Sequence, residues 1–184
     1  MAMCDDDDIR QVVAAAEGGP DMAVPIADRL IAAHPDDARL HFLRGSMLAG
    51  SGRPIEAHAS LSRAVALAPD FALARFQLGF FELTSAEPVR AQATWEPLNA
   101  LPTEHPLRRF VVGLTHLIHD RFADAIVELE AGIAANVETQ PLNHDMRLII
   151  DQCAALIDPA VPDVAEASAT SFLLGQPGGR GAPH

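Results

Sequence analysis

A spacing of 34 residues recurs along much of this chain and constrains its fold more than any other feature. Agreement of several residue types on one period of roughly 20–50 residues indicates a stacked array of structural repeats. The residues that share this step are Gly45, Gly79 and Gly113; Ala57, Ala91 and Ala125; Phe42, Phe76 and Phe110; Pro20, Pro54 and Pro88; and Pro35 and Pro69. The sequence therefore predicts a repeat protein in which each unit packs on its neighbours.

The clearest unit covers residues 38–71 and contains two predicted helices. The first runs from about residue 38 to residue 49, and residues 50–52 form the turn. Pro54 suits the first position of the second helix, because its missing N–H would have no partner there. Apolar residues at steps of three and four then form one face, and Pro69 ends the unit. That face consists of Ala57, Leu61, Ala64 and Leu67.

Gly45 and Ala57 are small, which lets the two helices approach closely where they cross. A large side chain in such a contact typically costs about 1–3 kcal/mol. With Leu48, Leu61, Ala64 and Pro69 they form a pattern that resembles the tetratricopeptide repeat (TPR). The resemblance implies an all-α fold, a right-handed superhelical solenoid of antiparallel helix pairs. Its signature residues here are Gly45, Ala57, Pro69, Gly79, Ala91, Gly113 and Ala125.

The repeat register divides the chain into six predicted segments. Residues 1–37 form a degenerate first helix pair, and residues 38–71, 72–105 and 106–139 form three TPR units. Residues 140–158 form a capping helix, and residues 159–184 form a disordered tail rich in Pro and Gly. Within the third unit Glu82 replaces a large apolar residue, and Pro97 predicts a kink or early helix end near Glu96.

The capping helix is expected to begin after Pro141, with Asn143 as its N-cap, and to end near Asp158. Its apolar face should pack on the last repeat, while the opposite face meets water. Cys153 lies on the apolar side, which predicts a buried and unreactive thiol. The residues of this face are Met146, Ile149, Ile150, Cys153, Leu156 and Ile157.

Two clusters of possible metal ligands have simpler interpretations. The carboxylates of residues 5–8 suit the start of a first helix, whose N-terminus favours negative charge. The alternative is a divalent-metal site, but no spaced calcium-loop pattern follows. His116 and His119 stand three residues apart on a predicted helix, as two metal ligands can. With no third ligand apparent, we interpret them as a packed or surface pair, and we expect no metal and no cofactor.

The first helix of each pair should line the concave surface of the solenoid. In the family register, that surface would form a peptide-binding groove. The expected groove residues are Phe42, Leu73, Phe76, Phe80, Leu83, Leu107, Phe110, Leu114 and Leu117. The alternative for Phe42, Phe76 and Phe110 is that they pack between adjacent first helices. Family members that grip C-terminal carboxylates use Lys, Arg and Asn here, whereas these positions are mostly apolar, which argues against that activity.

An apolar groove suits an amphipathic helix or an extended apolar segment of another protein. We therefore expect a non-enzymatic interaction module, an adaptor or chaperone-like scaffold. The alternative is a self-assembling protein, for example a homodimer, in which the groove receives the capping helix or tail of another copy. The possible docking residues of the tail are Phe172, Leu173 and Leu174, which otherwise form a chance apolar cluster.

Charge and composition exclude several classes of partner. A net charge of −12 argues against nucleic acid, because phosphate binding needs a basic face. No stretch approaches the roughly 18 apolar residues of a membrane span, so we expect no membrane partner. The acidic N-terminus lacks the basic and apolar regions of a secretory signal, and two apparently unpaired cysteines fit a reducing compartment. These observations predict a cytoplasmic protein, and no motif supports an enzyme.

Overall fold

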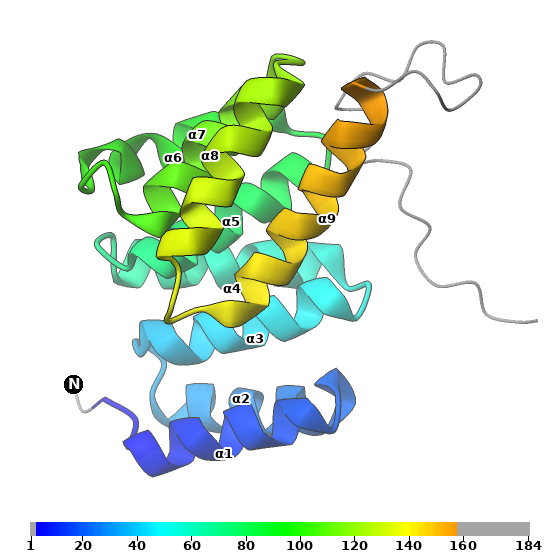
Figure 1. Ribbon diagram of the computed structural model, residues 1–184. Coiled ribbons are helices and arrows are strands. Elements are labelled where there is room, and N and C mark those ends of the chain that lie inside the picture. The colour runs from blue at the N-terminus through cyan, green and yellow to red at the C-terminus, as the bar shows by residue number, and fades with distance from the viewer. Residues whose placement is uncertain (1–2, 158–184) are drawn as a thin grey trace, which may run out of the picture. The chain divides into compact units, whose positions relative to one another are not determined.

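The structure is a computed structural model that describes residues 3–157. This part of the chain consists of nine α-helices and one 3-10 helix, and it contains no strand (Figure 1). The prediction of an all-helical fold is confirmed. The chain divides into two compact units between Glu82 and Leu83, called unit 1 and unit 2 below, and each is described by itself.

Unit 1 contains two helix pairs and most of a fifth helix. The helices are α1 (Asp6–Glu17), α2 (Pro20–Ala33), α3 (Ala38–Gly50), α4 (Pro54–Leu67) and α5 (Ala72–Thr84), the last of which reaches the unit boundary. Helix α1 packs on α2, α2 on α3 and α3 on α4 (Figure 1). Pro20 and Pro54 stand at the first positions of α2 and α4, where a proline costs no helical hydrogen bond.

Alanines and leucines on the inner faces of these helices form the core of unit 1. Val12, Ala27 and Leu40 are fully buried in one cluster that joins α1, α2 and α3. Where α3 crosses α4, a Cβ built at Gly45 would lie 2.7 Å from Cγ of Leu61, well inside normal contact. Only glycine fits at this crossing without a shift of α4.

Unit 2 contains the remaining helices. They are α6 (Pro88–Trp95), the 3-10 helix η1 (Glu96–Ala100), α7 (Pro106–Ile118), α8 (Phe122–Ala135) and α9 (Gln140–Ile157). Helices α7 and α8 form a pair, and α9 packs along α8 (yellow and orange in Figure 1). The crossing of α7 and α8 repeats that of α3 and α4, because a Cβ at Gly113 would lie 2.8 Å from Leu129.

Helix α6 is short because the chain changes to 3-10 geometry directly after Trp95. Pro97 stands at the second position of η1, where its ring prevents continuation of the α-helical hydrogen bonds. The prediction of an early helix end near Glu96 is confirmed.

Helix α9 differs from its prediction at its N-terminus. It begins at Gln140, so Pro141 lies in its first turn and Asn143 lies inside the helix, not at its N-cap. The Asn143 side chain is buried and pairs with Asn136, whose Nδ2 donates to Asn143 Oδ1 over 2.8 Å. Asn143 Nδ2 also donates to the carbonyl of Asn136 over 3.2 Å. The asparagine pair therefore fixes the start of α9 to the end of α8.

The turns that follow α3, α5 and α7 share a left-handed residue at the same repeat position. Gly52 has φ of 71°, Ala86 has 63° and Asp120 has 55°, and these residues stand 34 apart. Left-handed geometry costs a residue with a Cβ roughly 1–2 kcal/mol. The three turns therefore have the same backbone shape, although only the first has glycine at this position. The residue pattern did not indicate the shared shape for this reason.

Candidate binding surfaces

Three of the nine predicted groove residues are partly exposed, and all three belong to unit 1. Phe42 lies on α3, and Leu73 and Phe80 lie on α5. The Phe42 ring contacts the Phe71 ring at a centroid distance of 5.1 Å, which connects α3 to the start of α5. Phe80 stacks on Phe76 at 6.1 Å with an interplanar angle of 8°. Rigid aromatic side chains held in this way offer contact area at little entropic cost.

The other six predicted groove residues are buried. They are Phe76, Leu83, Leu107, Phe110, Leu114 and Leu117, each exposed by 7% or less. The reason is visible at Phe110, whose ring packs directly over Gly132 of α8. A Cβ on Gly132 would lie 2.6 Å from Phe110 Cδ1. The prediction of an open groove along these positions is therefore wrong, and their side chains are core residues.

Of the three repeated phenylalanines, Phe76 and Phe110 are thus buried, whereas Phe42 is partly exposed and contacts Phe71 at the start of α5. For Phe110 the sequence contained a signal. Gly132 stands 68 residues after Ala64 and 34 after Leu98, so only the last repeat has a glycine that admits the ring, and this signal does not extend to Phe76. The tail residues Phe172, Leu173 and Leu174 lie outside the described residues.

Unit 2 contains a pocket that the repeat pattern did not predict. Its volume is about 330 Å³, and it lies between the end of α6, η1 and α7. Trp95, Val111 and Val112 supply apolar walls, and Gln92, Asn99 and Thr115 supply polar atoms. The pocket lies where α6 ends at Trp95 and the narrower 3-10 helix η1 begins.

His116 and His119 lie at this end of unit 2 but serve different contacts. His116 lines the pocket, and its Nδ1 atom is buried without a hydrogen bond. His119 is the C-cap of α7, and its Nε2 lies 3.3 Å from Nε2 of Gln92. Over residues 3–157, no three His, Cys, Asp or Glu side chains come together as a metal site would require.

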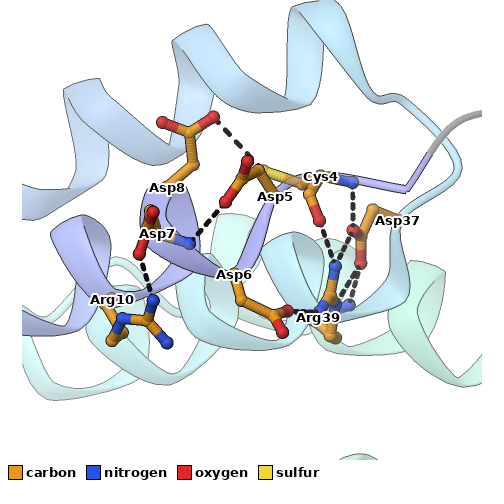
Figure 2. Close-up of polar contacts among 8 residues, drawn as sticks. All are labelled: Cys4, Asp5, Asp6, Asp7, Asp8, Arg10, Asp37 and Arg39. Atoms are coloured by element: carbon orange, nitrogen blue, oxygen red, sulfur yellow. Dashed lines mark hydrogen bonds and ion pairs between the residues drawn. The ribbon is translucent and has the colours of Figure 1, made fainter.

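Unit 1 contains a buried polar network that attaches the N-terminal segment to the start of α3 (Figure 2). Asp37 accepts the backbone N–H of Cys4 at 2.9 Å, and Arg39 Nη2 donates to the Cys4 carbonyl at 2.6 Å. Arg39 also donates to Asp37 over 2.8 Å and to Asp6 over 2.8 Å. Two side chains at the N-terminus of α3 therefore bind both backbone groups of Cys4. Sequence reasoning missed this network because its partners are more than 30 residues apart.

The protonation of the network follows from these contacts. Burial alone would raise the pKa of Asp37. Hydrogen bonds from the Arg39 side chain and from the Cys4 and Arg39 amides outweigh it, so that the pKa lies below its usual range. Hydrogen bonding to Asp37 raises the pKa of Arg39 further above its already high value. The pair is therefore charged at neutral pH.

The acidic N-terminus begins a helix, as predicted. Asp5 is the N-cap of α1 and accepts the N–H of Asp7 at 2.7 Å. Asp7 pairs with Arg10 one turn later (Figure 2). The carboxylates thus satisfy the first N–H groups of α1 and complement its dipole.

Glu82, which replaces a large apolar residue in the third repeat (residues 72–105), is almost completely buried on α5. Its Oε1 lies 3.5 Å from Nε2 of His58 on α4, too far for a well-formed hydrogen bond. The His58 ring also lies 6.3 Å from the Phe81 ring. A polar contact therefore occupies the position at which the preceding repeat has Leu48.

Both cysteines are buried and unpaired. Burial raises the pKa of the Cys153 thiol to about 11, as expected for an unreactive thiol on the inner face of α9. Burial and then the Asp8 carboxylate raise the pKa of the Cys4 thiol. Along residues 3–157, no helix has the length and apolar character needed to cross a membrane.

No protein-family model matches this chain, and no curated protein matches it by sequence. Solved structures similar to it include two of MamA. "MamA 41-end from Desulfovibrio magneticus RS-1" has a TM-score of 0.56 and 15% identity, over 83% of this chain and 92% of that one. "MamA RS-1 ArsTM double mutant" has a TM-score of 0.56 and 13% identity, over 85% and 99%. The likeness is one of fold. It supports a helical-repeat architecture of the tetratricopeptide type.

Proposed function

We propose that this chain is a non-enzymatic interaction module that binds an apolar segment or amphipathic helix of another protein. The proposed site is the face of unit 1 that carries Phe42, Leu73 and Phe80. The observation that supports it most strongly is the partial exposure of these three side chains on α3 and α5. Apolar side chains on the first helices of a repeat array are typical anchors for a bound peptide.

The charge on this face also favours an apolar ligand. Arg39 of α3 stands 34 residues before Leu73 and therefore occupies the equivalent repeat position. Its guanidinium already binds Asp6, Asp37 and the Cys4 carbonyl. An acidic peptide would have to displace these partners, whereas an apolar segment can bind beside them. Aromatic anchors near the centre of such a contact usually carry most of its binding energy.

Affinity purification from the native cell, with mass spectrometry, tests this proposal with a matched pair of variants. Phe80→Glu places a charge on the proposed face. Ile55→Glu makes the same kind of change at a residue of α4 that is 85% exposed. A protein that binds the wild type and Ile55→Glu, but not Phe80→Glu, is the expected partner. Circular dichroism confirms that both variants fold.

The recovered partner then defines the ligand. Its binding segment, made as a peptide, should bind with a negative heat-capacity change, because apolar surface is buried. Retention of every partner by the folded Phe80→Glu and Phe42→Glu variants would refute the proposed face.

A further inference from the structure

The pocket of unit 2 has walls suited to an apolar side chain. Trp95 closes it from α6, and Val111 and Val112 line it from α7. Polar groups of Gln92, Asn99 and Thr115 also line it. Amides and a hydroxyl beside an apolar pocket can pair with the backbone of an extended segment.

The pocket has a volume of about 330 Å³. This is room for one or two side chains of a bound segment.

The charges of the pocket favour an uncharged occupant. Glu96 and Arg121 both line it, with opposite signs. An anionic ligand would meet the carboxylate, and a cationic ligand would meet the guanidinium. An uncharged apolar segment avoids both conflicts.

The chain itself contains a segment with these properties. Residues 167–179 carry no charge, and Phe172, Leu173 and Leu174 stand together within them. Gly175 and Pro177 follow, which disfavours a helix and suits an extended segment.

A short stretch of chain connects this segment to unit 2. Helix α9 belongs to unit 2 and ends at Ile157, 15 residues before Phe172. Fifteen residues span at most about 50 Å when extended, and about 20–25 Å on average as a flexible chain. Helix α9, with 18 residues, is about 27 Å long. Covalent attachment also gives the segment an effective concentration in the millimolar range.

We propose that the pocket between α6, η1 and α7 binds residues 171–174 of the same chain, with the Phe172 ring inside the pocket. This site is separate from the proposed partner face of unit 1 and does not depend on it. The pocket then serves as the anchor of the C-terminal segment.

Nuclear magnetic resonance of the full chain tests this directly, because Trp95 is the only tryptophan and gives a single indole N–H signal. Phe172→Glu should shift the signals of the Trp95 indole and the Val112 amide. Val164→Glu introduces the same charge in the same tail and should leave both unchanged. Both changes lie outside residues 3–157, the part of the chain in which the structure describes the core around the pocket.

The reciprocal variants act from the pocket. Val112→Arg fills it and should lower the amide order parameter of Phe172 from about 0.8 to below about 0.6. Val127→Arg, at a residue of α8 that is 63% exposed, should leave it unchanged. Identical Trp95 and Val112 signals in wild type and Phe172→Glu would overturn the proposal. Signal changes that depend on protein concentration would assign the segment to a second copy and overturn the same-chain site.

Discussion

The close crossing of α3 and α4 can be tested by making the same glycine-to-alanine change at two positions of α3, Gly45 and Gly50. A Cβ at Gly45 would lie 2.7 Å from Cγ and 3.0 Å from the backbone nitrogen of Leu61. A Cβ at Gly50, the last residue of α3, meets nothing within 4 Å. Replacing a helical glycine by alanine gains up to about 1 kcal/mol of helix propensity at either position.

In Gly45→Ala alone, the new methyl group also clashes with Leu61. This clash costs about 1–3 kcal/mol, because the backbone of α4 cannot rotate away. We expect Gly50→Ala to be neutral or stabilising by up to about 1 kcal/mol. Gly45→Ala should be less stable than Gly50→Ala by about 1–3 kcal/mol.

Urea unfolding followed by far-ultraviolet circular dichroism measures this difference. With a slope of about 2 kcal/mol per molar, the midpoints of the two variants should differ by about 0.5–1.5 M. Equal midpoints, or a higher midpoint for Gly45→Ala, would refute the close crossing.

Three other predictions concern the polar network, the last helix and the buried thiol. Asp37→Asn should destabilise the chain near neutral pH and remove part of its acid sensitivity. The pKa of Asp37 is lower in the folded chain than in the unfolded one. Its contribution to the free energy of unfolding is therefore present above the unfolded pKa of about 3.9 and is lost as the pH falls through the folded pKa. Urea titrations at several pH values check this. Asn143→Ala should cost about 1–3 kcal/mol, because it removes two hydrogen bonds between the buried Asn143 side chain and Asn136, whereas His144→Ala, at an exposed residue, should cost little in a thermal melt. Cys153, with a pKa of about 11, should react with a thiol reagent at pH 8 only after denaturant is added, and fast labelling of the native chain would contradict its burial.

The helices and their crossings were predictable because they depend on local spacing. The 34-residue period gives the register of the repeats. Within each repeat, prolines such as Pro54 at a helix start and Pro97 at a helix end act on neighbouring backbone atoms. Gly45 and Gly113 likewise report a crossing inside one pair.

The binding surfaces were not predictable in the same way, because exposure depends on contacts made elsewhere in the fold. Phe42 and Phe110 occupy equivalent repeat positions, yet only Phe110 is buried, over Gly132. Asn143 looked like a cap from its neighbours, but a partner seven residues away in the chain changed its role. The Cys4, Asp37 and Arg39 network has no local pattern at all.

Site-specific photo-crosslinking in the native cell tests the central claim, that the α3 and α5 face of unit 1 binds another protein. A photoreactive phenylalanine analogue at position 80 should give a discrete crosslinked product with another protein. The same analogue at position 55, which is 85% exposed on α4, should not give that product. Identical products from both positions, or none from position 80, would contradict the account.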